Sequence, residues 1–180
     1  MRRAVLSVLA ALLLTGCGNE RTTVPDLSRP VNPVGTQRVE LAGIRFTAPA
    51  NWTVLGPQGE LLGGLQSGTA TMAVWRYPRT EPLPADRDAL REVRGLLVER
   101  VERRDPTFDL DRARLVRRGG ADGIELLGRQ TINGRRVGVR SAHLFAGGDE
   151  VVIDAYAPHS RFEQLDESVF LPLLDSLKLR

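Results

Sequence analysis

The sequence predicts an α+β domain in which an antiparallel β-sheet is covered by helices. Short segments of alternating apolar residues are separated by glycine-containing turns, as in antiparallel strands. Two other segments carry apolar residues at spacings of three and four, as in amphipathic helices. The order is strands, helix, four strands, helix, which is typical of α+β proteins. We expect a single domain over residues 38–180.

Several short strands are expected before the first helix. Ala42-Gly43 interrupts an alternating segment and predicts a hairpin turn. The segment 61–68 is rich in glycine, and we interpret it, with Ser67, as a glycine-bearing turn. The strands predicted in this region are residues 38–48 (as a hairpin), 51–55 and 69–77.

A long amphipathic helix is predicted over residues 86–104. Asp86 is a candidate N-cap, and Asp105-Pro106 would end the helix. The face opposite the apolar stripe is densely charged with both signs, as expected of a solvent-exposed face. The apolar stripe consists of Leu90, Val93, Leu97 and Val101.

A four-stranded antiparallel meander follows the long helix. Asn133-Gly134 is the strongest hairpin signal in the chain, and glycine pairs mark the two other turns. A second helix is predicted to begin near Ser160, its candidate N-cap, and Pro172 is expected to open a further helical turn. The four predicted strands are residues 113–117, 124–132, 137–145 and 151–156.

The N-terminus has the pattern of a bacterial export signal. Residues 1–16 begin with two arginines and continue as an apolar run that is too short for the roughly 20 residues of a membrane-spanning helix. The run ends in Leu14-Thr15-Gly16-Cys17, which resembles the lipobox of bacterial lipoproteins. The resemblance implies removal of a signal peptide, residues 1–16, and a diacylglyceryl group on the Cys17 thiol. Such a protein is exported and anchored by lipid to the cell membrane, with its domain on the extracytoplasmic side.

Residues 17–37 are predicted to form a lipid-anchored flexible tether, because they are rich in proline and poor in large apolar residues. Without residues 1–16 the chain has 23 basic and 22 acidic residues. This balance argues against a nucleic-acid partner. The membrane, contacted through the lipid on Cys17, is therefore the first expected partner.

The domain resembles the PsbP-like superfamily. The resemblance rests on GIRFTAPANW over residues 43–52, the long helix, the Asn133-Gly134 hairpin and the closing FEQLDESVFLPLLDSLKL. It implies an α/β/α sandwich. It does not imply catalysis, because members of this superfamily are largely binding and scaffolding proteins, and it transfers no site residue.

The sequence contains no complete catalytic or metal-binding motif. HExxH and CxxC are absent, and Ser67 is not in a GxSxG elbow. Ser141 and His143 share one face of a predicted strand, but the sequence indicates no acid partner for them. We therefore expect no metal and no cofactor.

Five residues are candidates for ligand binding. Trp52 and Trp75 fit either core anchors or the aromatic walls of a pocket. His143 fits either a hydrogen-bonded histidine beside the core or a site residue. Asp154 lies in the middle of a predicted strand and needs a partner, for which Arg129 and Arg140 are candidates.

These observations predict a non-catalytic, lipid-anchored cell-envelope protein. Its domain would bind or scaffold an envelope protein or an apolar or glycan ligand. The alternative is an envelope hydrolase with a site around Asp154, His143 and Arg140. Close polar groups in a solvent-open cavity would favour the enzyme, whereas buried and mutually paired side chains would weaken it.

Overall fold

The computed structural model describes residues 29–179. The predicted signal peptide, residues 1–16, and Cys17 lie outside the described residues. The strands are β1 (Gln37–Leu41), β2 (Ile44–Ala48), β3 (Thr53–Leu55), β4 (Leu61–Ser67), β5 (Ala70–Pro78), β6 (Asp109–Arg118), β7 (Ala121–Ile132), β8 (Arg135–Ala146) and β9 (Asp149–Pro158). The helical elements are α1 (Arg87–Arg104), α2 (His159–Leu165), the π-helical turn η1 (Asp166–Phe170) and α3 (Leu171–Asp175).

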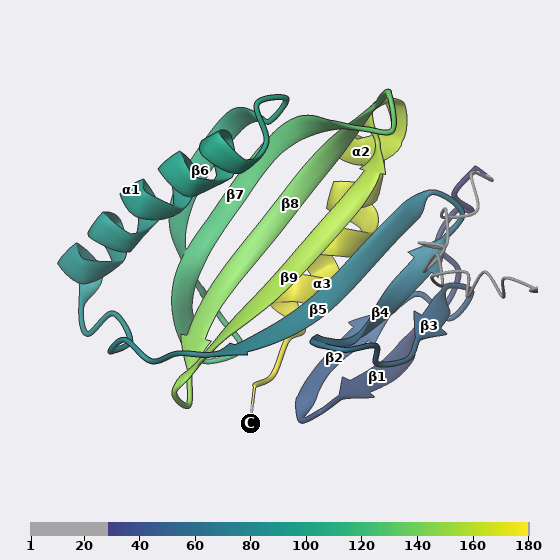
Figure 1. Cartoon of the computed structure of the whole chain (residues 1–180). Coiled ribbons are helices and arrows are strands. Elements are labelled where there is room, and N and C mark those ends of the chain that lie inside the picture. The colour runs from purple at the N-terminus through teal and green to yellow at the C-terminus, as the bar shows by residue number, and fades with distance from the viewer. Residues whose placement is uncertain (1–28, 180) are drawn as a thin grey trace, which may run out of the picture.

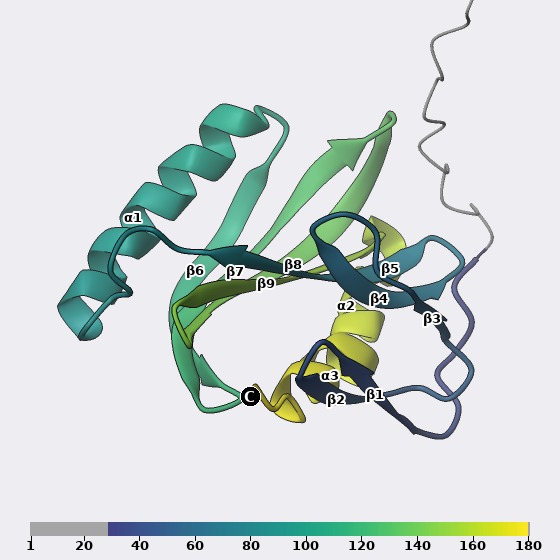
Figure 2. The ribbon, with the colours of Figure 1, turned by 60° about the horizontal axis from the view of Figure 1, so that its bottom comes forward.

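The molecule is a three-layered α+β sandwich, which confirms the predicted fold class (Figure 1). Seven strands form one sheet in the order β3-β4-β5-β9-β8-β7-β6, and every pairing is antiparallel. Helix α1 covers one face at the β6–β7 side. The continuous helical segment α2–η1–α3 and the separate β1–β2 hairpin cover the other face (Figure 2). Among residues 29–179, no helix is both long and apolar enough to cross a membrane.

Each layer contact encloses an apolar core. The larger core lies between the sheet, the β1–β2 hairpin and the C-terminal helical segment, and it includes Ile44, Leu65 and Phe170. The smaller core lies under α1, where Leu90 packs with Ile124 and other residues of the sheet. Both faces of the sheet are therefore covered by apolar contacts, although α1 leaves part of its face open.

The predicted start and end of α1 are confirmed. One carboxylate oxygen of Asp86 accepts hydrogen bonds from the backbone N–H groups of Asp88 and Ala89, both at 2.9 Å. The helix ends at Arg104, one residue before the Asp105-Pro106 pair.

The glycine-rich segment predicted as a turn is strand β4, so that prediction is wrong. A side chain at Gly64 would place its Cβ 2.1 Å from the backbone oxygen of Met72 on β5. The glycine therefore allows the close approach of two strands. Ser67 ends this strand, and its hydroxyl accepts a hydrogen bond from the Val31 N–H at 3.0 Å.

The C-terminal helical segment also differs from its prediction. Helix α2 begins at His159, directly after β9, and Ser160 does not cap it. The π-helical turn inserts one extra residue into the helical repeat. Its buried residues are Asp166, Val169 and Phe170. Pro172 does lie in the first turn of α3, as predicted.

The described part of the predicted tether lies against the domain. The Asn51 side chain donates to the Asn32 carbonyl at 2.8 Å and accepts from the Val34 N–H at 3.0 Å. Residues 31–34 therefore lie against the folded unit, because their backbone polar groups find partners on it.

A buried ion network joins the C-terminal helical segment to the sheet. Arg140 of β8 is 2% exposed, and its Nε and Nη2 donate to the two carboxylate oxygens of Asp166, each at 2.5 Å. Its Nη1 donates to Glu125 of β7, which is also 2% exposed. Glu125 additionally accepts from Arg114 Nε of β6 at 2.8 Å. Buried charges are tolerated because each is paired and hydrogen-bonded.

The network extends to the end of the helical segment. Arg118 of β6 approaches Glu125 at 3.3 Å and also pairs with Asp175, the last residue of α3. Burial opposes the charge on Glu125, but Arg140, Arg114 and Arg118 outweigh it and lower the pKa of Glu125. Burial likewise opposes the charge on Arg140, but the hydrogen bonds and charges of Asp166 and Glu125 raise its pKa.

The replacement Arg140→Met should destabilise the fold by about 3–5 kcal/mol, because two buried carboxylates lose their shared cation. The free energy of unfolding, measured with urea at neutral pH, checks this. Arg135→Met is the matched control, because Arg135 is an exposed residue of the same strand and should change stability by less than about 0.5 kcal/mol. Equal stability of the two variants would contradict a stabilising role for the network.

Candidate functional site

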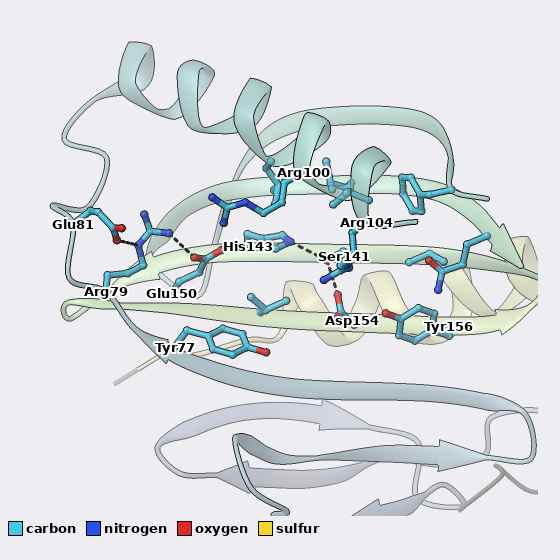
Figure 3. A pocket seen from close by; sticks show the side chains of 17 residues that line it. Tyr77, Arg79, Glu81, Arg100, Arg104, Ser141, His143, Glu150, Asp154 and Tyr156 are labelled. Carbon is cyan, nitrogen blue, oxygen red and sulfur yellow. Dashed lines mark hydrogen bonds and ion pairs between the residues drawn. The ribbon is translucent and has the colours of Figure 1, made fainter. Parts of the chain in front are cut away.

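A cavity of about 390 Å³ lies between α1 and the sheet face opposite the C-terminal helical segment (Figure 3). Strands β8 and β9 supply most of its floor, with contributions from β5 and β7, because α1 packs mainly over β6 and β7. The last turns of α1 supply one wall, with Leu97, Arg100, Val101 and Arg104.

Strand alternation brings the polar side chains to this floor. Ser141 and His143 of β8 point to the cavity together with Val139, since every second residue of a strand shares a face. On β9 the same face carries Glu150, Asp154 and other residues. The two-residue turn Gly147-Gly148 fixes the register, which pairs Ser141 with Asp154 directly across the two strands.

Hydrogen bonds connect these side chains in a row along the floor. Glu150 Oε1 lies 2.7 Å from His143 Nδ1, and His143 Nε2 lies 3.1 Å from Ser141 Oγ. Ser141 Oγ lies 2.5 Å from Asp154 Oδ1. Arg79 closes one end of the row by donating to Glu150 Oε2 at 2.8 Å. We call Glu150, His143, Ser141 and Asp154 the polar row.

Ser141 lies between two hydrogen-bond acceptors of the polar row when the His143 ring is neutral. His143 donates from Nδ1 to Glu150, so Nε2 of a neutral ring is an acceptor. Ser141 has a single hydroxyl proton but lies between this nitrogen and the Asp154 carboxylate. The row is therefore fully paired only when a further proton sits on His143 or Asp154, or when a ligand supplies a donor.

The surroundings fix the protonation of three neighbouring groups. Burial alone would raise the pKa of Glu150, but its hydrogen bond to His143 and the charge of Arg79 lower it. Burial raises the pKa of Tyr156, and Asp154 adds to the effect. Burial and the charge of Glu60 raise the pKa of Tyr77. Glu150 is therefore a carboxylate at neutral pH, and both phenols are neutral hydrogen-bond donors.

The charged side chains around the cavity balance one another. Three arginines and three carboxylates line it. Both signs are spread around the walls, as Figure 3 shows for the labelled side chains. The site is therefore rich in hydrogen-bonding groups without a strong net charge. These six residues are Arg79, Arg100, Arg104, Glu81, Glu150 and Asp154.

The structure brings together only two of the five candidates named from the sequence. His143 and Asp154 meet through Ser141 in the cavity. Arg140 lies on the opposite face of β8 in the ion network, so the predicted grouping of Arg140 with His143 and Asp154 is wrong. The partner of Asp154 is Ser141, and neither Arg129 nor Arg140 fills that role.

The two tryptophans do not line the cavity. Trp52 is 3% exposed in the larger core, where its ring meets Phe170 edge to face at 6.1 Å. Trp75 is half-buried on β5, opposite Val152 of β9.

Sequence reasoning missed Ser141 and Glu150 as functional candidates. The sequence indicates no acid partner for Ser141 and His143, but each of them contacts one in the structure. Ser141 contacts Asp154, and His143 contacts Glu150. The Gly147-Gly148 turn was the available signal, because a two-residue hairpin sets which residues lie opposite each other. Within residues 29–179, no group of three or more His, Cys, Asp or Glu side chains is placed to hold a metal ion.

Comparisons with known proteins identify the fold. No protein-family model matches the sequence, and no curated protein matches it significantly. CyanoP, the cyanobacterial PsbP of Synechocystis sp. PCC 6803, has a similar structure, with 14% identity, a TM-score of 0.60, and coverage of 93% of this chain and 99% of CyanoP. LpqN of Mycobacterium tuberculosis, which is involved in cell envelope biogenesis, is also similar. It has 17% identity and a TM-score of 0.56, and the match covers 82% of this chain and 91% of LpqN. PA94 of Pseudomonas aeruginosa, a putative regulator of unknown function, has 13% identity and a TM-score of 0.54. The match covers 81% of this chain and 97% of PA94. These likenesses support the PsbP-like fold that the sequence predicted.

Replacing Glu150 by Gln should lower the free energy of unfolding by about 2 kcal/mol at neutral pH, because hydrogen bonds to charged partners are lost. The folded-state pKa of Glu150 is lowered from 4.5, so its contribution is present above pH 4.5 and is lost as the pH falls through the folded-state value. The difference between wild type and Glu150→Gln should therefore shrink in acid.

Denaturant unfolding between neutral and acidic pH measures the difference in unfolding free energy between the wild type and Glu150→Gln. Glu81→Gln is the control, because the Glu81 side chain is 70% exposed and its pair with Arg79 should contribute little. A loss of unfolding free energy in Glu150→Gln that stays constant down to acidic pH would contradict the lowered pKa of Glu150.

Proposed function

We propose that this protein is a lipid-anchored binding protein of the cell envelope, whose domain binds a glycan in the cavity between α1 and the floor of β8 and β9. The observation that carries the proposal is the polar row itself, whose four hydrogen-bonded side chains line an open cavity between the sheet and α1. A sugar hydroxyl that donates to Asp154 or His143 completes the row, because each hydroxyl can donate and accept at once.

The other walls of the cavity suit the same ligand. Balanced charge favours a neutral polyhydroxylated molecule over a strongly charged one. Tyr77, which is 36% exposed, and Phe108 offer aromatic surface for the apolar faces of a sugar ring. Arg100 and Arg104 can donate several hydrogen bonds from a fixed planar group.

The cellular location rests on the lipobox-like segment and on one structural neighbour. Cys17 follows an export signal at the position where lipoproteins are acylated. LpqN, which shares the fold, is involved in cell envelope biogenesis. Acylation on Cys17 would hold the domain at the membrane, because two or more acyl chains give stable anchoring.

A hydrolase is the second candidate, and the cavity favours it in the way expected from the sequence, because His143 and Asp154 line it with mutually close polar groups. Ser141, His143 and Glu150 have the order and spacing of a nucleophile, a base and an orienting acid. Two features argue against it. Strand β8 is paired with β7 and β9 on both sides of Ser141, so its backbone N–H groups are engaged in the sheet and cannot stabilise an oxyanion. The Ser141 proton is also shared with Asp154, which competes with His143 for it.

Nuclear magnetic resonance of residues 18–180 titrated with neutral oligosaccharides, such as those of N-acetylglucosamine, tests the binding proposal. We expect chemical-shift changes at Ser141, His143, Asp154 and the last turns of α1. Asp154→Asn should weaken binding about tenfold, since a charged acceptor is lost. Asp122→Asn, an exposed residue on β7, should not.

Shift changes confined to other surfaces would overturn the assignment of this cavity. Hydrolysis of the added oligosaccharide, abolished by Ser141→Ala, would favour the hydrolase instead.

Acylation of Cys17 predicts a difference between the wild-type protein and Cys17→Ala when both are expressed in a bacterial host. The wild type should lose residues 1–16 and gain the mass of its acyl groups, because the thiol is the attachment point. Cys17→Ala should do neither. Intact-mass spectrometry measures both, and an unmodified mass for the wild type would refute the anchor.

A further inference from the structure

A second hollow, of about 730 Å³, lies at the end of the sheet formed by the β7–β8 turn, the β4–β5 turn and the start of α2. This end is at the upper right of Figure 1. Its floor is largely apolar and includes Ile132, Val137 and Pro158. Four basic side chains line it, and we call it the arginine groove; these residues are Arg29, Arg135, Arg136 and Arg161.

The charge of the arginine groove is strongly one-sided. No Asp or Glu is among its lining residues. Arg136 is held by Asp109 at 2.9 Å, and Arg161 donates to the Asn32 side chain at 3.0 Å. Arg135 is exposed at the start of β8. This contrasts with the balanced charges of the cavity under α1, so the two hollows suit ligands of different chemistry.

Apolar and cationic groups lie side by side at this end of the domain. Ile132 is 40% exposed at the tip of the β7–β8 hairpin, next to the arginines. Guanidinium groups bind phosphate through charge-assisted, often bidentate hydrogen bonds. Burial of an exposed aliphatic side chain at the boundary between lipid headgroups and acyl chains is favourable. Together these groups match the surface of an anionic phospholipid bilayer.

The groove also lies where the chain enters the domain. Arg29 and Pro30 line it, and Cys17 precedes Arg29 by 12 positions. An extended chain of that length spans at most about 40 Å. If Cys17 is acylated, as proposed above, this end of the domain is therefore kept close to the membrane, which raises its effective concentration there.

We propose that the arginine groove and the Ile132 tip dock on the anionic phospholipid surface of the membrane that holds the Cys17 anchor. The docking adds a second attachment to the lipid anchor. It places the end of the sheet that carries the β7–β8 turn against the bilayer and restricts the orientation of the domain.

Vesicle co-sedimentation of residues 18–180 tests this inference. This segment contains every strand and helix described above, and circular dichroism checks that it is folded. It should bind vesicles of phosphatidylcholine and phosphatidylglycerol at low salt, and should not bind phosphatidylcholine alone. High salt should abolish binding, because the attraction is screened.

The double variant Arg29→Gln/Arg135→Gln should weaken vesicle binding about tenfold or more. The control Arg87→Gln/Arg112→Gln changes the net charge equally at exposed residues that do not line the groove. It should bind as the unsubstituted domain does. Ile132→Ser should weaken binding while leaving its salt dependence in place.

Three results would overturn the inference: no binding to vesicles containing phosphatidylglycerol, equal binding to phosphatidylcholine alone, or equal loss in the two double variants. Complete competition by soluble glycerol phosphate would also overturn it, since the site would then take a small anion. The assay contains no acylated protein, so its outcome is separate from the mass measurement on Cys17.

Discussion

The arrangement of the layers depends on Arg140. Its guanidinium binds Asp166 with two nitrogens and Glu125 with a third, so a single side chain joins two strands to the turn between α2 and α3. None of the three charges could be buried alone without a large loss of stability. Asp166, which meets the arginine, is the first residue of the π-helical turn. The network thereby fixes where the C-terminal helical segment rests on the sheet.

Because that segment and the β1–β2 hairpin cover one face, the other face is free to carry polar groups. Strand β8 shows this division most clearly. Arg140 and Ala142 point into the larger core, while Ser141 and His143 point into the cavity under α1. The ion network and the polar row are thus on opposite sides of the same strand. Substitutions in the polar row can therefore change binding while the ion network stays intact.

The cavity under α1 and the arginine groove contrast in character and share Tyr156 as a lining residue. The cavity under α1 has balanced charges and a hydrogen-bonded row of polar groups, whereas the arginine groove is apolar and cationic. A binding protein held at a membrane needs one surface for its ligand and another for its support. The proposed division of roles assigns the first to the cavity and the second to the groove, at the end of the sheet where the chain leads back to Cys17.

The sequence by itself determined the α+β class, the cap and end of α1, and the meander with its turns. These depend on local patterns of apolar spacing and turn residues. Strand alternation also separates Arg140 from His143, and the Gly147-Gly148 turn places Asp154 opposite Ser141, although the prediction did not use either constraint. Only the tertiary structure decided that Arg79 reaches Glu150, that Asp166 reaches Arg140, and that Arg29 lines the same hollow as the β7–β8 turn. The physical reason is that pairings between distant segments follow from the burial of whole faces of the sheet, which no local stretch of sequence encodes.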